Sequence, residues 1–194
     1  MASSTRAPRG VTLVRHPDTP CDAVHAVTAR VSRVSPGTLA AHYLIEGDVA
    51  RLNVPDAGPA HLGRELWQHT CCEMFISRGG ATYHEFNFAP SGAWAVYAFD
   101  HYRHGGPLDN EALNPPPVSS IAARSDQHSV EIHASIHLDR LPPQLASEKF
   151  LLALSAVIEE RNGRLSYWAL RHPPGKPDFH HRDGFVLELD EVRN

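Results

Sequence analysis

A run of ten residues, 129–138, alternates apolar and polar side chains without a break, and few folds accommodate such a pattern. One set is Val130, Ile132, Ala134, Ile136 and Leu138, and the intervening set is Ser129, Glu131, His133, Ser135 and His137. Because successive side chains of a β-strand point to opposite faces, this period of two predicts an antiparallel strand with one buried face. Its histidines fall on the polar face, where we expect them to be solvated.

Similar short runs recur along the chain between turn-forming residues. We expect further strands at residues 24–34, 39–46, 49–54, 71–76, 83–89, 94–99, 151–158, 165–170 and 185–189. Gly47-Asp48 is expected to join the second and third of these runs. About ten short strands without long helical periods predict an all-β, immunoglobulin-like antiparallel β-sandwich. Residues 1–194 are expected to form one domain, with residues 1–10 flexible.

Two segments allow more than one assignment. Residues 144–163 contain apolar residues at a helical spacing, but Asn162-Gly163 is a strong hairpin signal between two β-forming runs. The sequence therefore predicts a hairpin, preceded by a short helical turn near residues 143–149. Residues 102–120 contain Gly105-Gly106 and three consecutive prolines, and they predict a long irregular loop. Loops of such length are usually functional or mobile.

Charge and cysteine content exclude several classes of function. The formal net charge is −4, and no cluster of basic residues offers the face that nucleic acids or anionic membranes require. The three cysteines, two of them adjacent, form no disulfide framework, which favours a reducing compartment. The sequence contains no apolar run of membrane-spanning length and no signal-peptide pattern. We therefore expect a soluble cytoplasmic protein that binds neither nucleic acid nor membrane.

The first candidate site lies on residues 67–92. Phe86 and Phe88 share one face of the expected strand, so Glu85 and Asn87 project side by side from the other. A paired carboxylate and amide, with an aromatic platform nearby, suit the hydroxyls and the apolar face of a sugar. The alternative is a solvated outer face without a ligand. The candidate ligand contacts here are Trp67, His69, Glu85 and Asn87.

The second candidate site is the polar loop at residues 171–183, directly after an expected strand. Three prolines and a glycine stiffen this loop, which orders its polar side chains before any ligand binds. If the protein binds a ligand, this loop and the strands of the first site should meet. The alternative is a loop that only covers the end of the sandwich, with Asp178 and Phe179 in structural roles. The candidate ligand contacts are Trp168, Arg171, His172, Lys176, Asp178 and His180.

Metal and thiol chemistry have weaker signals. The 14 histidines are spread along the chain, and no HExxH helix is present. His172, His180 and Asp178 are nevertheless suitable zinc donors, and they define an alternative in which the protein is a metal-dependent hydrolase. Cys71-Cys72 lacks the spacing of redox or zinc sites, so both thiols are expected to fill core space. The sequence thus predicts no catalytic residue and no metal ligand.

Three longer runs carry a family resemblance: LWQHTCCEMFI, YHEFNFAPSGAWAVYAFDHYR and LSYWALRHPPGKPDFHHRDGFVLEL. They resemble bacterial DOMON-like domain proteins, whose superfamily includes family-nine carbohydrate-binding modules and cytochrome-type DOMON domains. The resemblance spans most of residues 65–103 and 153–189. It implies an immunoglobulin-like β-sandwich that binds a sugar or haem b.

The resemblance also implies ligand contacts. The sugar-binding relatives hold a sugar between tryptophans, a role for which this chain offers Trp67, Trp94 and Trp168. The cytochrome relatives use a methionine with a histidine or lysine as haem ligands, which would involve Met74. We expect a non-catalytic domain that binds a carbohydrate or another small polar ligand and needs no cofactor. Haem b binding and a hydrolase with a divalent metal are the alternatives.

Overall fold

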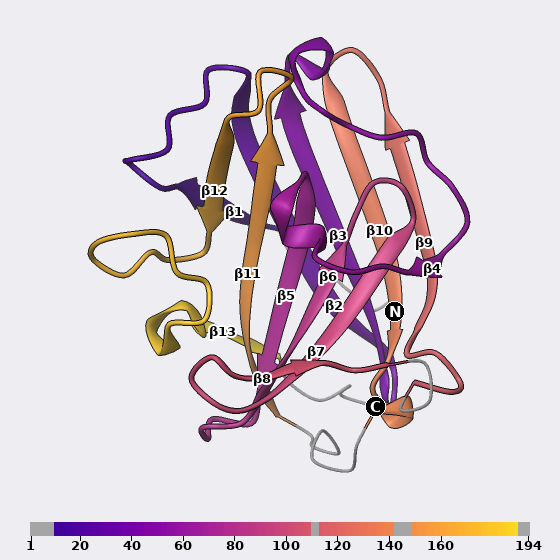
Figure 1. Ribbon diagram of the computed structural model, residues 1–194. Helices are drawn as coiled ribbons and strands as arrows, with labels where there is room; N and C mark the ends of the chain where they lie inside the picture. Colours follow the sequence, from indigo (N-terminus) through magenta and orange to yellow (C-terminus); the bar gives the residue numbers. More distant parts are fainter. Residues whose placement is uncertain (1–9, 110–112, 142–148, 190–194) are drawn as a thin grey trace, which may run out of the picture.

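The computed structural model describes residues 10–109, 113–141 and 149–189 (Figure 1). These ranges contain thirteen strands, and the helices found within them are single short 3-10 turns. None of these helices is long and apolar enough to cross a membrane. The flexible segment expected at residues 1–10 and the helical turn expected near residues 143–149 lie almost wholly outside the described residues.

The strands form two sheets that face each other, so the expected all-β sandwich is confirmed (Figure 1). The first sheet contains, in spatial order, β2 (Val24–Ser35), β3 (Thr38–Gly47), β10 (Ser129–His137) and β9 (Val118–Ser125). The second contains β4 (His61–Leu62), β7 (Ala93–His101), β6 (Tyr83–Phe88), β5 (Cys71–Ser77), β11 (Phe150–Glu159) and β12 (Leu165–Ala169). β8 (His104–Pro107) pairs with β7, and β13 (Leu187–Leu189) pairs with β11.

A single short strand, β1 (Val11–Arg15), joins the two sheets. Its first half pairs with β2, where Leu13 lies opposite Val27. Its second half pairs with β12, where Val14 lies opposite Ala169. The two layers are therefore one hydrogen-bonded sheet that folds back on itself.

Alternating side chains from both sheets fill the space between the layers. On β10 the predicted apolar set is buried from Val130 to Ile136, which confirms the expected strand and its inward face. Phe86 and Phe88 of β6 enter the same core from the second sheet. Full burial of side chains of this size contributes roughly 1.5–3 kcal/mol each relative to exposure. The inward set fixes which side chains face outward, and the outward face of the second sheet carries the site.

The hairpin predicted at Asn162-Gly163 is confirmed. β11 and β12 pair in an antiparallel register, and the backbone N–H of Glu160 donates to the carbonyl of Arg164 at 2.9 Å. Gly163 takes a φ of +83°, a conformation that glycine adopts at little cost. Most other expected strands are also present, although the last is limited to β13.

Two expectations about local structure are wrong. Residues 49–54 do not pair with β3, because β2 and β10 already occupy its two edges. The chain then turns through η1 (Val49–Arg51). Residues 102–120 are not an irregular loop throughout, since they contain β8 and the start of β9.

Candidate functional site

The outer face of the second sheet carries a group of buried polar side chains. Strand pairing places Glu73 of β5 directly beside Asn87 of β6 on one side and Ser155 of β11 on the other. Glu85 lies two residues before Asn87, so its side chain projects from the same face, as the sequence predicts. All four side chains are at most 5% exposed. Buried polar groups of this kind require partners within the protein.

A cavity of about 370 Å³ lies on this face. Glu73 and Glu85 line it, together with the aromatic residues Trp67, Tyr97, Phe99, Tyr167 and Phe179. Trp67, from η2 (Leu66–Gln68), remains 47% exposed. The volume falls within the range of roughly 300–1,000 Å³ that is typical of small-molecule sites. An exposed indole beside buried carboxyl groups makes this cavity the candidate ligand site.

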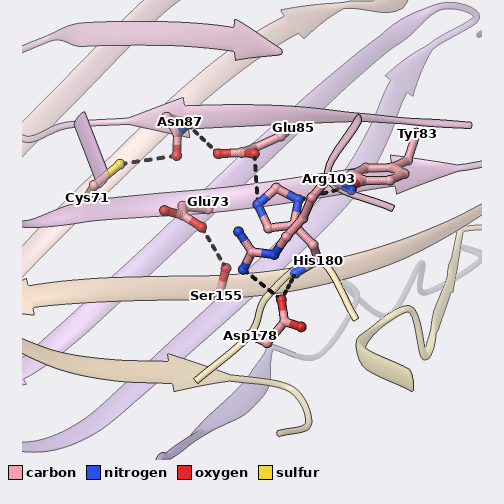
Figure 2. Close-up of polar contacts among 9 residues, drawn as sticks. All are labelled: Cys71, Glu73, Tyr83, Glu85, Asn87, Arg103, Ser155, Asp178 and His180. Atoms are coloured by element: carbon pink, nitrogen blue, oxygen red, sulfur yellow. Dashed lines mark hydrogen bonds and ion pairs between the residues drawn. The ribbon is translucent and has the colours of Figure 1, made fainter. Parts of the chain in front are cut away.

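Burial sets the protonation of the two carboxyl groups, whose hydrogen bonds to Asn87 and Ser155 are drawn in Figure 2. Desolvation raises the pKa of Glu85 to about 7, although Asn87 Nδ2 donates a hydrogen bond to its Oε1 at 2.7 Å. Desolvation, reinforced by the charge of Glu85, raises the pKa of Glu73 well above its usual range, although Ser155 Oγ donates to its Oε2 at 3.3 Å. Two neighbouring buried carboxyl groups resist double ionisation, so the pair retains a proton near neutral pH.

His180 lies beside Glu85, reaching it from the loop after β12 (Figure 2). Its Nδ1 lies 2.9 Å from Tyr83 Oη, which accepts a hydrogen bond from the backbone N–H of Arg103 at 3.0 Å. The tyrosine proton is then free to point at Nδ1, which places the imidazole proton on Nε2, 3.7 Å from Glu85 Oε2. Burial, aided by the charge of Arg103, lowers the pKa of His180 to about 4. The ring is therefore neutral near pH 7 and does not balance the charge of Glu85.

Arg103 connects two segments that border the cavity. It lies in the turn between β7 and β8, with a left-handed φ of +54°. Its Nη2 donates to Asp178 Oδ1 at 2.8 Å, and Tyr102 Oη donates to Asp178 Oδ2 at 2.6 Å. These bonds tie the turn to the loop at residues 171–183. The predicted meeting of that loop with the strands of the first candidate site is thus present in the structure.

Five of the ten predicted ligand contacts lie in or beside the cavity. Trp67, Glu85 and His180 line it directly. Asn87 holds Glu85 in place, and Asp178 holds Arg103.

The other five predicted contacts lie elsewhere. His69 Nδ1 lies 2.8 Å from Glu159 Oε2, and His172 Nε2 lies 2.8 Å from the carbonyl of Val14. Arg171 is exposed and does not line the cavity, and Lys176 lies at a neighbouring hollow.

Trp168 requires a correction. Its strand position directs the indole into the core between the sheets, where it is only 5% exposed. Its Nε1 donates to Ser166 Oγ at 3.0 Å, so its polar atom is already paired. Trp94 is buried in the same core, and a clamp of two tryptophans is therefore absent at the cavity.

Glu73 and Arg103 were not among the predicted ligand contacts. A signal for Glu73 was present, because the alternation that turns Met74 inward also turns Glu73 outward. Arg103 had no comparable signal, since its role depends on contacts with Asp178 across 75 positions of sequence. The aromatic wall was missed for the same reason, because it gathers residues from several strands and the loop.

The thiols of the adjacent cysteines are both fully buried, but they face opposite sides of the second sheet. Cys72 packs in the core, as expected. Cys71 faces the site, and its Sγ lies 3.5 Å from Asn87 Oδ1 (Figure 2). Burial raises the pKa of the Cys71 thiol well above its usual range, which makes it a weak nucleophile.

The residues present do not fit either alternative, haem or a metal held by His172, His180 and Asp178. Met74 is fully buried in the core and offers no sulfur to a group in the cavity. The ring of His172 contacts Val14, while that of His180 contacts Tyr83 and Glu85. Within the described ranges, donors that converge closely enough for one ion are His42, Glu131 and His133, and separately Asp100, His101 and His104. Neither group lines the cavity.

The fold is shared with a solved structure. It is similar to that of a candidate carbohydrate-binding protein from Bacteroides uniformis, with a TM-score of 0.62 and 15% identity over 93% of this chain and 84% of that one. The chain has that β-sandwich fold. A family-nine carbohydrate-binding module from Caldicellulosiruptor kristjanssonii, solved with cellotriose, aligns with a TM-score of 0.48 and 10% identity over 91% and 85% of the two chains. The sequence itself matches no protein-family profile and no curated protein.

Proposed function

We propose that this chain is a non-catalytic domain that binds a carbohydrate in the cavity of the second sheet. The observation that carries the proposal is the position of the half-exposed Trp67 ring beside the buried carboxyl groups of Glu73 and Glu85. An aromatic ring covers the apolar face of a sugar, and carboxyl groups pair with its hydroxyls. The carbohydrate-binding description of the Bacteroides uniformis protein, which has the same fold, supports this ligand class.

The polar groups of the site are held in place before any ligand arrives. Asn87 fixes Glu85, Ser155 fixes Glu73, and Asp178 fixes Arg103. Preorganisation of this kind reduces the entropy lost on binding. It suits a domain that recognises a small rigid ligand.

The test is isothermal titration calorimetry with a panel of monosaccharides and disaccharides, accompanied by thermal unfolding. A sugar at a hundred times its dissociation constant should raise the free energy of unfolding by about 2.7 kcal/mol. A panel in which no sugar releases heat or raises the melting temperature would contradict the proposal.

The non-catalytic part of the proposal has a separate readout. Each sugar that binds should be recovered unchanged after prolonged incubation with the protein. Two carboxyl groups beside a sugar are also the equipment of glycoside hydrolases. Release of a reducing end or of an aglycone, lost in Glu85→Gln, would overturn this part and leave sugar recognition intact.

We also propose that the domain functions in a reducing compartment, the cytoplasm. All three cysteines are buried and unpaired, which is compatible with that environment. Cell fractionation that recovers the protein outside the cytoplasm would contradict this placement.

A further inference from the structure

The charges around the cavity are unbalanced. Glu73 and Glu85 face it from β5 and β6, and the groups that hold them are the neutral side chains of Ser155 and Asn87. The nearest histidine, His180, stays 3.7 Å from Glu85.

Among the described residues that line the cavity, Arg103 is the one permanent cation. Its guanidinium is hydrogen-bonded to Asp178, whose carboxylate offsets its charge. The charge of Arg103 also lowers the pKa of Glu73 and Glu85, so this one permanent cation is shared among three carboxyl groups, two of them desolvated. A buried carboxylate is stabilised most by an opposite charge within about 4–6 Å.

The walls of the cavity suit a cation as well as a sugar. Trp67, Tyr97, Phe99, Tyr167 and Phe179 line it. The faces of such rings carry partial negative charge and attract ammonium groups, by roughly 0.5–2 kcal/mol for each favourable contact. Tyr97, Tyr167 and Cys71, the other titratable groups near the acids, add no positive charge.

We infer that the ligand carries a protonated amine, and that an amino sugar binds with its ammonium group beside Glu73 and Glu85 and its ring against the aromatic wall. This inference rests on the proposed carbohydrate-binding function and specifies its ligand class. The bound ammonium supplies the charge that the protein lacks. A neutral sugar leaves the carboxyl pair partly protonated and uncompensated.

The experiment is calorimetry at pH 7 with four probes: D-glucosamine, N-acetyl-D-glucosamine, D-glucose and cyclohexylamine. The first three share a sugar ring and differ in charge, and the last has the charge without the hydroxyls. D-Glucosamine should bind at least ten times more tightly than D-glucose or N-acetyl-D-glucosamine. Equal or weaker binding of D-glucosamine would overturn the inference while leaving carbohydrate binding in place.

The remaining outcomes separate the two proposals. If cyclohexylamine matches D-glucosamine, recognition of a cation is supported and the carbohydrate proposal is overturned. If none of the four probes binds and the wider sugar panel also fails, both are overturned.

Variants of Glu73 and Glu85 test whether these two acids cause the preference for D-glucosamine over D-glucose. Glu85→Gln and Glu73→Gln keep the shape of each side chain and remove its charge, so each should reduce the D-glucosamine advantage to less than threefold. The advantage is the ratio of D-glucosamine affinity to D-glucose affinity within each variant, and circular dichroism with urea unfolding checks that each variant is folded. Glu188→Gln, an exposed acid on β13 that does not line the cavity, is the control and should keep the full advantage. An advantage that persists in both cavity variants would overturn the inference.

Discussion

Trp67 and Trp168 have opposite environments although both were predicted to contact a ligand. Trp67 lies in a 3-10 turn beside the cavity and is 47% exposed. Trp168 lies on β12 with its ring in the core and its Nε1 bonded to Ser166. The same residue type therefore serves binding in one position and stability in the other.

Replacement of the two tryptophans should separate these roles. Trp67→Ala should weaken sugar binding about tenfold, near 1.4 kcal/mol, and change the free energy of unfolding by less than about 1 kcal/mol. Trp168→Phe should destabilise by roughly 1–3 kcal/mol, because the hydroxyl of Ser166 loses a partner, and should leave affinity unchanged. Calorimetry and urea unfolding measure the two quantities. Loss of binding without loss of stability in Trp168→Phe would contradict this assignment.

The residues that could be placed from the sequence are those whose environment depends on local geometry. Glu85 and Asn87 could be placed on one face because a strand alternates wherever it forms. The inward position of Trp168 could not be chosen from the strand pattern alone, since that pattern shows two faces without showing which one meets the other sheet. Arg103 could not be assigned at all, because its partner Asp178 is distant in sequence.

The turn of the β7–β8 hairpin carries Arg103, so this hairpin must form for Arg103 to line the cavity. Gly105 of β8 pairs with Phe99, and a Cβ at this position would overlap the carbonyl of Ala98. The neighbouring Gly106 has open space where its Cβ would lie. The two adjacent glycines thus have different requirements within one element.

Gly105→Ala should disrupt this hairpin. We expect a loss of at least about 2 kcal/mol in the free energy of unfolding, because backbone atoms cannot move aside as a side chain can. Sugar affinity should fall as well, since the turn carries Arg103. Gly106→Ala is the matched control and should stay within about 0.5 kcal/mol of the unmodified protein in stability. Similar behaviour of the two variants in urea unfolding would refute the distinction.

Secondary-structure elements could be predicted from the sequence where the residues of a turn specify them. Asn162-Gly163 specifies a two-strand connection by itself. Residues 49–54 contain β-forming side chains, but β2 and β10 already pair with both edges of β3. β8 is a short strand with two glycines and a proline, and only its pairing with β7 makes it a strand.

At the scale of the whole molecule, buried titratable groups make stability depend on pH in two directions. The pKa of Glu85 rises to about 7 in the folded state, so folding retains a proton that the unfolded chain releases, and stability falls as pH rises from about 4.5 through 7. The pKa values of His84 and His180 fall to about 4 through burial. The stability that these neutral histidines contribute to the folded state is therefore lost as pH falls from about 6.5 towards 4.

The variant Glu85→Gln isolates the loss of stability that ionisation of Glu85 causes as pH rises. At pH 5 the carboxyl group of Glu85 is neutral, so the variant and the unmodified protein should be similar in stability. At pH 8 the unmodified protein must bury a charge, and the variant should gain about 2–3 kcal/mol relative to it. Urea unfolding at both pH values measures this difference. A difference that does not change between pH 5 and pH 8 would show that Glu85 titrates normally.

The strand β1 has a consequence for how the domain is made. Its first half pairs with residues near 28, but its second half requires residues 168 and 169. During synthesis, residue 169 must therefore leave the ribosome before the seam between the two layers can close. Contacts this distant in sequence slow folding and leave sheet edges open to other chains in the interval. The last strands to emerge thus complete the cavity, through β12 and its loop, and also close the sandwich.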